Sequence, residues 1–113
     1  MKLIHLFLYL ILILESSITY SDEVSNGISK SEIILGQSAA FKGPSAGLGT
    51  EYWRGSQLYF NKINAQGGVK GRKIKVISLD DGYDADKALS NTIQLINEHK
   101  VFALFDYVGT PTL

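Results

Sequence analysis

The sequence contains no cysteine among its 113 residues. This absence excludes disulfide bonds, thiolate metal sites and a thiol nucleophile, and it leaves no cysteine that could carry a lipid after export. Neither sign of charge is in excess, because 11 basic residues are matched by 11 acidic ones. A neutral chain lacks the basic footprint of a protein that binds a phosphate backbone, so we expect no nucleic acid partner.

The sequence also has no apolar run long enough to cross a membrane readily as a helix. Residues 3–14 are apolar apart from His5, whereas a membrane-spanning helix needs about 20 apolar residues. Lys2 precedes the run and a polar stretch follows it, which is the pattern of a secretory signal peptide. We interpret residues 1–21 as a signal peptide cleaved after Ser21, with a buried core helix as the alternative. An exported, unlipidated chain is most simply a periplasmic protein.

The remaining residues predict an α/β domain. Residues 22–31 are polar and predict a flexible lead-in. Three apolar runs follow, and helical patterns separate them; the expected strands are residues 33–40, 73–79 and 101–108. The β-α-β-α-β order is typical of a doubly wound parallel sheet with right-handed crossovers. We predict the strand order 2-1-3, with the second strand at an edge because Lys73 and Lys75 alternate with apolar residues.

Each expected helix has a candidate cap and an apolar face. Thr50 is the candidate N-cap of the first helix and Asp84 that of the second. Residues recurring at helical spacing predict the buried faces. These are Tyr52, Gly55, Ser56, Tyr59, Phe60 and Ile63 in the first helix, and Ala85, Ala88, Leu89, Thr92, Ile93 and Ile96 in the second.

The chain ends on the turn Gly109-Thr110-Pro111-Thr112. In a parallel sheet of this order, ligands bind at the carboxyl ends of the first and third strands, where the loop of residues 41–49 and this turn would lie. Thr110 is suited to an N-cap and Pro111 to the first helical position. A helix N-terminus there could hold a carboxylate or phosphate. The alternative is that Thr-Pro only starts a structural helix.

No residue set predicts catalysis, a metal or a cofactor. His99 lies among charges at a helix end, where we expect it to be solvated. Asp80 and Asp81 are adjacent and so point to opposite faces of a strand, and we interpret them as turn formers that help to cap the second helix.

The sharpest enzymatic alternative is a nucleotide-binding oxidoreductase. The spacing of Gly43, Gly47 and Gly49 is similar to the glycine loop of short-chain dehydrogenases. Pro44 stiffens that loop, and the acidic residue after the second strand comes over thirty residues later, where about 20 is usual. Export would also separate the chain from cytosolic cofactor, so we favour a binding protein.

Residues 33–112 resemble the ABC-transporter substrate-binding proteins of the branched-chain amino acid (Leu/Ile/Val-binding) type, which have the periplasmic binding protein type I fold. The motifs that carry the resemblance are Gly43-Pro44 with Gly49, residues 64–73 (NAQGGVKGRK), and Asp80-Asp81. Members of the family are several hundred residues long. The resemblance therefore implies that residues 32–113 are the N-terminal part of the first of two lobes that close on a ligand.

The resemblance also implies a site and partners. In the family, the loop after the third strand holds the ligand carboxylate, which corresponds here to Gly109, Thr110 and Thr112, while Phe41 and Leu48 match ligand contacts after the first strand. Leucine-binding members tend to carry an aromatic residue near Leu48 and a serine near Gly109, and both are absent. The implied partners are an amino acid or amide ligand and an ABC permease in the inner membrane. An exported sensor domain of a membrane receptor remains an alternative.

Overall fold

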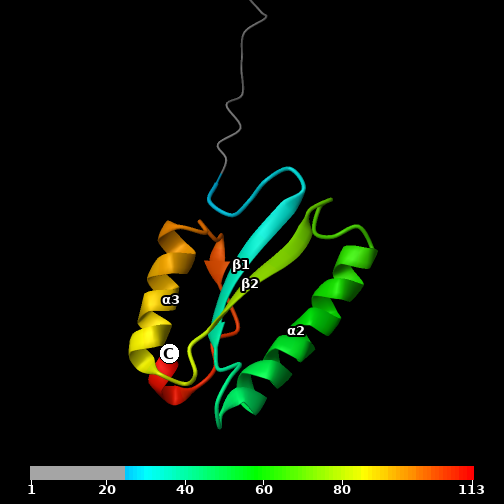
Figure 1. Cartoon of the computed structure of the whole chain (residues 1–113). Coiled ribbons are helices and arrows are strands. Elements are labelled where there is room, and N and C mark those ends of the chain that lie inside the picture. Colours follow the sequence, from blue (N-terminus) through cyan, green and yellow to red (C-terminus); the bar gives the residue numbers. More distant parts are fainter. Residues whose placement is uncertain (1–24) are drawn as a thin grey trace, which may run out of the picture.

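The computed structural model describes residues 25–113, which form a three-stranded parallel sheet with two α-helices (Figure 1). The signal-peptide prediction for residues 1–21 lies outside the described residues. The elements in chain order are β1 (Glu32–Ala39), α2 (Ala46–Ala65), β2 (Lys73–Asp80), α3 (Ala85–Asn97), β3 (Ala103–Leu104) and the short 3₁₀ helix η1 (Thr110–Thr112). Among residues 25–113, no helix is both long and apolar enough to cross a membrane.

The sheet has the predicted order, β2-β1-β3, with parallel pairing throughout. Strand β1 pairs with β2 along its whole length, from Glu32 opposite Lys73 to Ala39 opposite Asp80. It is the central strand, and its last residues, 36–39, are buried together with Ala40. The lysines at the start of β2 are exposed. The fold class and the edge position of β2 are therefore confirmed.

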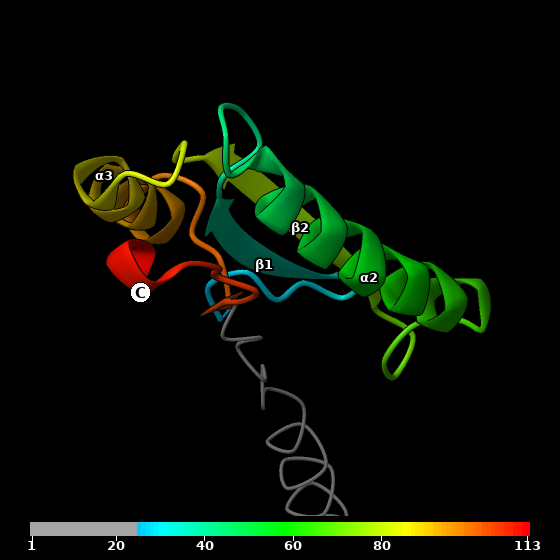
Figure 2. The ribbon, with the colours of Figure 1, turned by 90° about the horizontal axis from the view of Figure 1, so that it is seen from below.

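Helices α2 and α3 lie on opposite sides of the sheet (Figures 1 and 2). The cap predicted for α3 is confirmed, because the Asp84 carboxylate accepts a hydrogen bond of 2.9 Å from the Lys87 N–H. The predicted faces are only partly right. In α3 the buried residues are Ala88 and Leu95, whereas Leu89 and Ile93 are 61% and 52% exposed. The helix is rotated away from the predicted face because Leu95 packs over Gly36 of β1, where an added Cβ would lie 3.1 Å from its side chain.

Helix α2 begins at Ala46 rather than after Thr50. The glycines within residues 46–49 predicted a loop. Gly49 instead lies in the first turns of the helix, where it lets the helix backbone approach the end of β1 closely. A Cβ at this position would lie 2.1 Å from the carbonyl oxygen of Ala40. Of the predicted face, Phe60 and Ile63 are half-buried, as expected, whereas Tyr52 and Tyr59 are exposed.

The free edge of β2 is covered by a side chain of α2. The Asn64 amide donates to the Ile74 carbonyl and accepts from the Ile74 N–H, both at 2.8 Å. These two bonds satisfy backbone groups that a neighbouring strand would otherwise pair. Asn64 therefore fixes the end of α2 against the start of β2.

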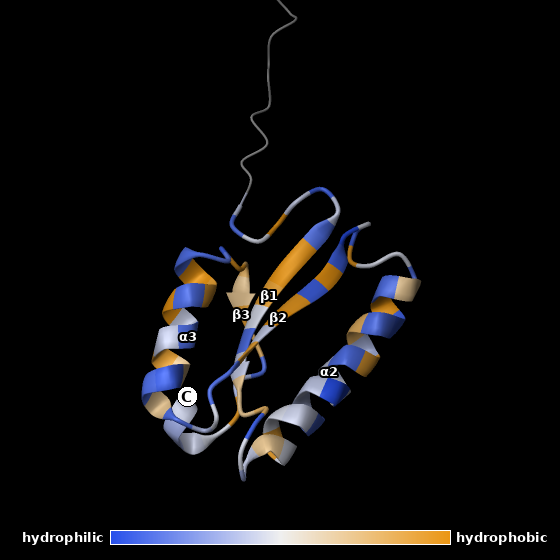
Figure 3. Cartoon of the chain, in the orientation of Figure 1, coloured by the Kyte–Doolittle hydropathy of each residue, from blue (hydrophilic) through white to orange (hydrophobic). Residues whose placement is uncertain are grey.

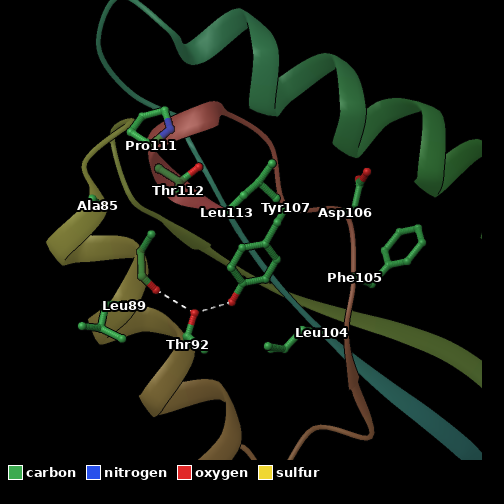
Figure 4. Close-up of a pocket in the computed structure, with 11 residues that line it drawn as sticks. Ala85, Leu89, Thr92, Leu104, Phe105, Asp106, Tyr107, Pro111, Thr112 and Leu113 are labelled. Carbon is green, nitrogen blue, oxygen red and sulfur yellow. Dashed lines mark hydrogen bonds between the residues drawn. The ribbon is translucent and has the colours of Figure 1, made fainter.

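Strand β3 is much shorter than the predicted residues 101–108. Its pairing with β1 covers only two residues, Ala103 and Leu104. Asp106 has a φ of 61°, which no strand residue adopts, and Gln37 holds it there by donating to its carbonyl (3.1 Å) and its carboxylate (2.9 Å). The chain turns at Asp106, so that Phe105 and Tyr107 point to different sides (Figure 4).

The described part of the predicted lead-in is bonded to the sheet. The Ile34 N–H donates to the Gly27 carbonyl at 2.7 Å, and the Arg72 side chain donates to the Ser29 carbonyl at 2.7 Å. Ile28 and Ile33 form an antiparallel bridge. The chain thus enters the sheet beside the start of β2, while the flexibility predicted for residues 22–31 stays a prediction.

Candidate functional site

The loop after β1 and the turn containing η1 both lie at the carboxyl end of the sheet (Figure 1). Phe41 belongs to the loop and Leu48 to the first turn of α2, whereas Gly109, Thr110 and Thr112 belong to the closing turn. Within residues 25–113, no hydrogen bond joins these two groups. The structure therefore places the five predicted residues at one edge but in two separate clusters.

Asp80, the last residue of β2, ties the loop after β1 to this edge. Its carboxylate accepts hydrogen bonds from the N–H groups of Phe41 (2.7 Å), Lys42 (3.1 Å) and Gly82 (3.3 Å). Burial favours the neutral acid and raises the pKa of Asp80, but these three bonds and the Lys42 charge outweigh it, so the pKa lies below its ordinary value. Asp80 thus orients the backbone of one predicted ligand-contacting loop.

Asp81 is fully buried and fixes the other side of the same edge. Its carboxylate accepts from the Ser38 hydroxyl and from the Tyr83 N–H, both at 2.8 Å. The prediction that the two aspartates form a turn is therefore right. The prediction that they help to cap α3 is wrong, because the side-chain cap is Asp84 alone.

The closing turn needs a glycine at residue 109. Gly109 has a φ of 116°, and a Cβ there would lie 2.4 Å from the Tyr83 ring. Gly109 is the N-cap of η1, so Thr110 and Pro111 each stand one position later than predicted. Thr110 is exposed, whereas Thr112 is buried and its hydroxyl donates to the carbonyls of Val108 (2.8 Å) and Gly109 (3.1 Å). Thr112 therefore braces the turn.

A groove of about 650 Å³ lies between α3 and the chain that follows β3 (Figure 4). It is lined by Ala85, Ala88, Leu89, Thr92, Leu104, Phe105, Asp106, Tyr107, Pro111, Thr112 and Leu113. Of the predicted site residues, only Thr112 lines it. The interrupting Asp106 in an otherwise apolar run was the one sequence signal that the chain would bend here.

Tyr107 crosses the groove to α3. Its hydroxyl lies 2.7 Å from the Thr92 hydroxyl, which donates to the Ala88 carbonyl at 2.7 Å. Because the Thr92 proton is already used, the Tyr107 hydroxyl is the donor between them. Burial raises the pKa of Tyr107; the Thr92 bond opposes this, and the charge of Asp81 adds to it. Tyr107 is thus held as a neutral phenol that connects the closing segment to α3.

His99 is half-buried and therefore less solvated than predicted. Its Nε2 atom is buried and has no hydrogen-bond partner among residues 25–113. The prediction failed because the segment of residues 25–29, which lines a second cavity together with His99, returns to this end of α3. Within the same residues, no cluster of His, Asp and Glu side chains is arranged to hold a metal ion.

Residues 32–113 match the family model described as "Periplasmic binding protein". An amino acid binding protein of Pseudomonas aeruginosa is 32% identical over 73 residues, which cover 65% of this chain and 20% of that protein. The chain spans about a fifth of the length of such relatives.

Solved structures agree with the sequence comparison. A possible leucine/isoleucine/valine-binding protein from Rhodopirellula baltica superposes with a TM-score of 0.70 at 35% identity, covering 74% of this chain and 22% of that one. A fatty acid ABC transporter substrate-binding protein from Thermomonospora curvata gives 0.69 at 34% identity, with 78% and 22% covered. The similar structures thus include proteins described for different classes of ligand.

Proposed function

Because the chain belongs to the periplasmic binding protein family, we propose that it is part of an exported solute-binding protein that captures an amino acid or a related small amide for an ABC permease of the inner membrane. The match over residues 32–113 is the observation that carries this proposal. The proteins matched are described as binding proteins, which supports a role without catalysis. Export through residues 1–21 and a periplasmic location are parts of the same proposal.

In the proposed site, the exposed closing turn holds the ligand carboxylate. Gly109 and Thr110 offer backbone N–H groups and one hydroxyl, while Thr112 holds their conformation from below. Phe41 and Leu48 contact the rest of the ligand from the loop that Asp80 orients. The absence of a side chain at Gly109 lets the Tyr83 ring pack against the turn and keeps it in this conformation.

A titration followed by backbone amide NMR signals tests this site. Leucine, valine and short amides are added to the 113-residue chain. We expect the signals of Gly109, Thr110, Phe41 and Leu48 to shift together. Thr110→Ala should weaken the response several-fold, whereas Ser90→Ala, which removes an exposed hydroxyl from α3, should leave it unchanged. Shifts confined to residues far from the carboxyl edge would overturn the proposed site.

The chain by itself should bind weakly. Proteins that close two lobes around a ligand gain affinity from both lobes, and this chain spans only about a fifth of its relatives. We expect dissociation constants weaker than micromolar by calorimetry. Micromolar affinity from the 113-residue chain would contradict this expectation. Saturable quenching of Trp53 fluorescence by NAD would instead revive the oxidoreductase alternative.

A further inference from the structure

The turn between β2 and α3 holds an aromatic residue in a backbone conformation that bulky residues rarely adopt. The turn spans Asp81 to Asp84 and is closed by a hydrogen bond of 3.0 Å from the Asp84 N–H to the Asp81 carbonyl. Its two central residues both have positive φ, 59° for Gly82 and 71° for Tyr83, which is the pattern of a type I′ turn. Glycine, asparagine and aspartate dominate such positions, so a tyrosine is strained there. Strained residues of this kind cluster at functional sites.

A buried polar network holds Tyr83 in this conformation. The Tyr83 N–H donates at 2.8 Å to one carboxylate oxygen of Asp81, which is fully buried. The other carboxylate oxygen accepts a bond of 2.8 Å from the hydroxyl of Ser38, a fully buried residue of β1. Asn91 of α3 donates to the Ser38 hydroxyl and to the Asp80 carbonyl, both at 3.1 Å. Because a connected buried network rigidifies the groups that it joins, the backbone of Tyr83 is fixed by β1, β2 and α3 together.

The strained turn carries the Tyr83 ring to the closing turn. A Cβ added at Gly109 would lie 2.4 Å from the Cε2 atom and 3.0 Å from the Cδ2 atom of Tyr83. One edge of the ring therefore lies against the Gly109 backbone and occupies the space that a side chain at residue 109 would need. Gly109 itself has a φ of 116°. Two left-handed residues from different loops thus meet at the carboxyl edge of the sheet.

Burial gives little reason for a tyrosine at this position. Tyr83 is only half-buried, and its neighbours Gly82 and Asp84 are exposed. Figure 3 shows the segment between β2 and α3 as mostly hydrophilic. Within residues 25–113, the Tyr83 hydroxyl has no hydrogen-bond partner. What the strained conformation achieves is the placement of the ring against the closing turn.

We propose that Tyr83 is a positioning residue of the ligand site. Its ring fixes the conformation of Gly109 and thereby the direction in which the N–H groups of Gly109 and Thr110 face the ligand carboxylate. Thr112 braces the turn from within through its hydroxyl, and Tyr83 supports it from the neighbouring loop. The role in binding rests on the proposed function, whereas the effect of Tyr83 on the turn is measurable in the free protein, so the two can fail separately.

Backbone amide NMR of the 113-residue chain without ligand tests the positioning. Tyr83→Asn removes the ring but keeps a residue that tolerates positive φ. We expect this variant to shift the signals of Gly109 and Thr110 and to leave those of Phe41 and Leu48 in place. Tyr83→Phe keeps the ring and should restore the original signals. When leucine is added, Tyr83→Asn should weaken the response several-fold because the turn is no longer preorganised, and Tyr83→Phe should restore it.

A matched control makes the same substitution at another tyrosine. Tyr59 lies on α2 and is 62% exposed, so Tyr59→Asn should change neither the Gly109 signal nor the response to leucine. If circular dichroism shows that Tyr83→Asn does not fold, the unaltered chain still decides, because its Tyr83 ring protons should show nuclear Overhauser effects to the Gly109 α-protons. Absence of these effects, or an unchanged Gly109 signal in a folded Tyr83→Asn variant, overturns the proposal. An unaltered chain that gives no response to leucine counts against the proposed function, while the free-protein signals still decide the role of Tyr83.

Discussion

A single carboxylate, that of Asp80, joins the end of β2 to the loop after β1 through hydrogen bonds from Phe41 and Lys42. Slight desolvation of the exposed carboxyl group raises the pKa of Asp80, but the bonds favour the ionised form, which is why the pKa lies below its ordinary value. A carboxylate with a lowered folded-state pKa stabilises the fold above its unfolded-state pKa, near 4, and that contribution is lost as the pH falls through the folded-state value.

Asp80→Asn should therefore make stability less dependent on pH in the acid range. The amide keeps the shape of the side chain but cannot ionise, so the variant should be less stable than the original at neutral pH and should converge with it as the pH falls below about 4. Urea unfolding at a series of acidic and neutral pH values measures this. Asp86→Asn, an exposed position in the first turn of α3, serves as the control for net charge, and convergence of the same size in that variant would contradict the role of Asp80.

At the scale of elements, α2 shows that two glycines in one helix can have different structural roles. Gly49 and Gly55 lie in the same helix, but an added Cβ meets the Ala40 carbonyl at 2.1 Å in the first case and nothing within 4 Å in the second. The first glycine lets the helix start lie against the end of β1, next to the loop that Asp80 holds. The second contributes only backbone freedom to the unfolded chain.

The two glycines should respond oppositely to replacement by alanine. Gly49→Ala forces a methyl group into rigid backbone and should destabilise the fold by about 1–3 kcal/mol. Gly55→Ala should stabilise it by about 0.5–1 kcal/mol, because alanine favours helix and the site is open. Chemical denaturation of the two variants measures the difference. Similar effects of the same sign would show that the first turns of α2 do not pack on Ala40.

At the scale of the whole molecule, the described chain leaves a large apolar surface uncovered. Leu89, Leu104 and Leu113 line the groove beside α3 and are exposed. Strand β3 has β1 as its neighbour on one side, and its other edge is unpaired within residues 25–113. Apolar patches and open strand edges promote association between chains. A chain of this size also buries a modest core, so its stability should be marginal.

Leu89→Glu should therefore reduce concentration-dependent association without a large loss of stability, since the side chain makes little buried contact. Ser90→Glu places the same charge on the next exposed residue of α3 and should have no comparable effect. Sedimentation velocity over a range of concentrations compares the two variants with the original chain. A strictly monomeric original chain would contradict the expectation.

Sequence reasoning alone was enough to predict the element order, the parallel 2-1-3 sheet, the Asp84 cap and the edge position of the second strand. The element order and the cap follow from local periodicity and neighbouring residues, which a sequence displays directly, whereas the strand order follows from the doubly wound arrangement that this element order favours. The same reasoning also predicted a ligand site at the carboxyl edge of the sheet, made of five candidate residues. The structure shows that these residues lie at that edge, and their contact with a ligand stays a prediction.

Other features depend on contacts between residues far apart in the chain, and the folded structure was needed to find them. Leu95 rather than Leu89 faces the sheet because it meets Gly36, and β3 ends early because Gln37 holds Asp106 out of strand geometry. Residues 25–29 reach the end of α3 and line a cavity with His99, and Asp80 bonds a loop almost forty residues away in the chain. A local pattern contains no information about such partners, since each contact exists only after the chain has folded back on itself.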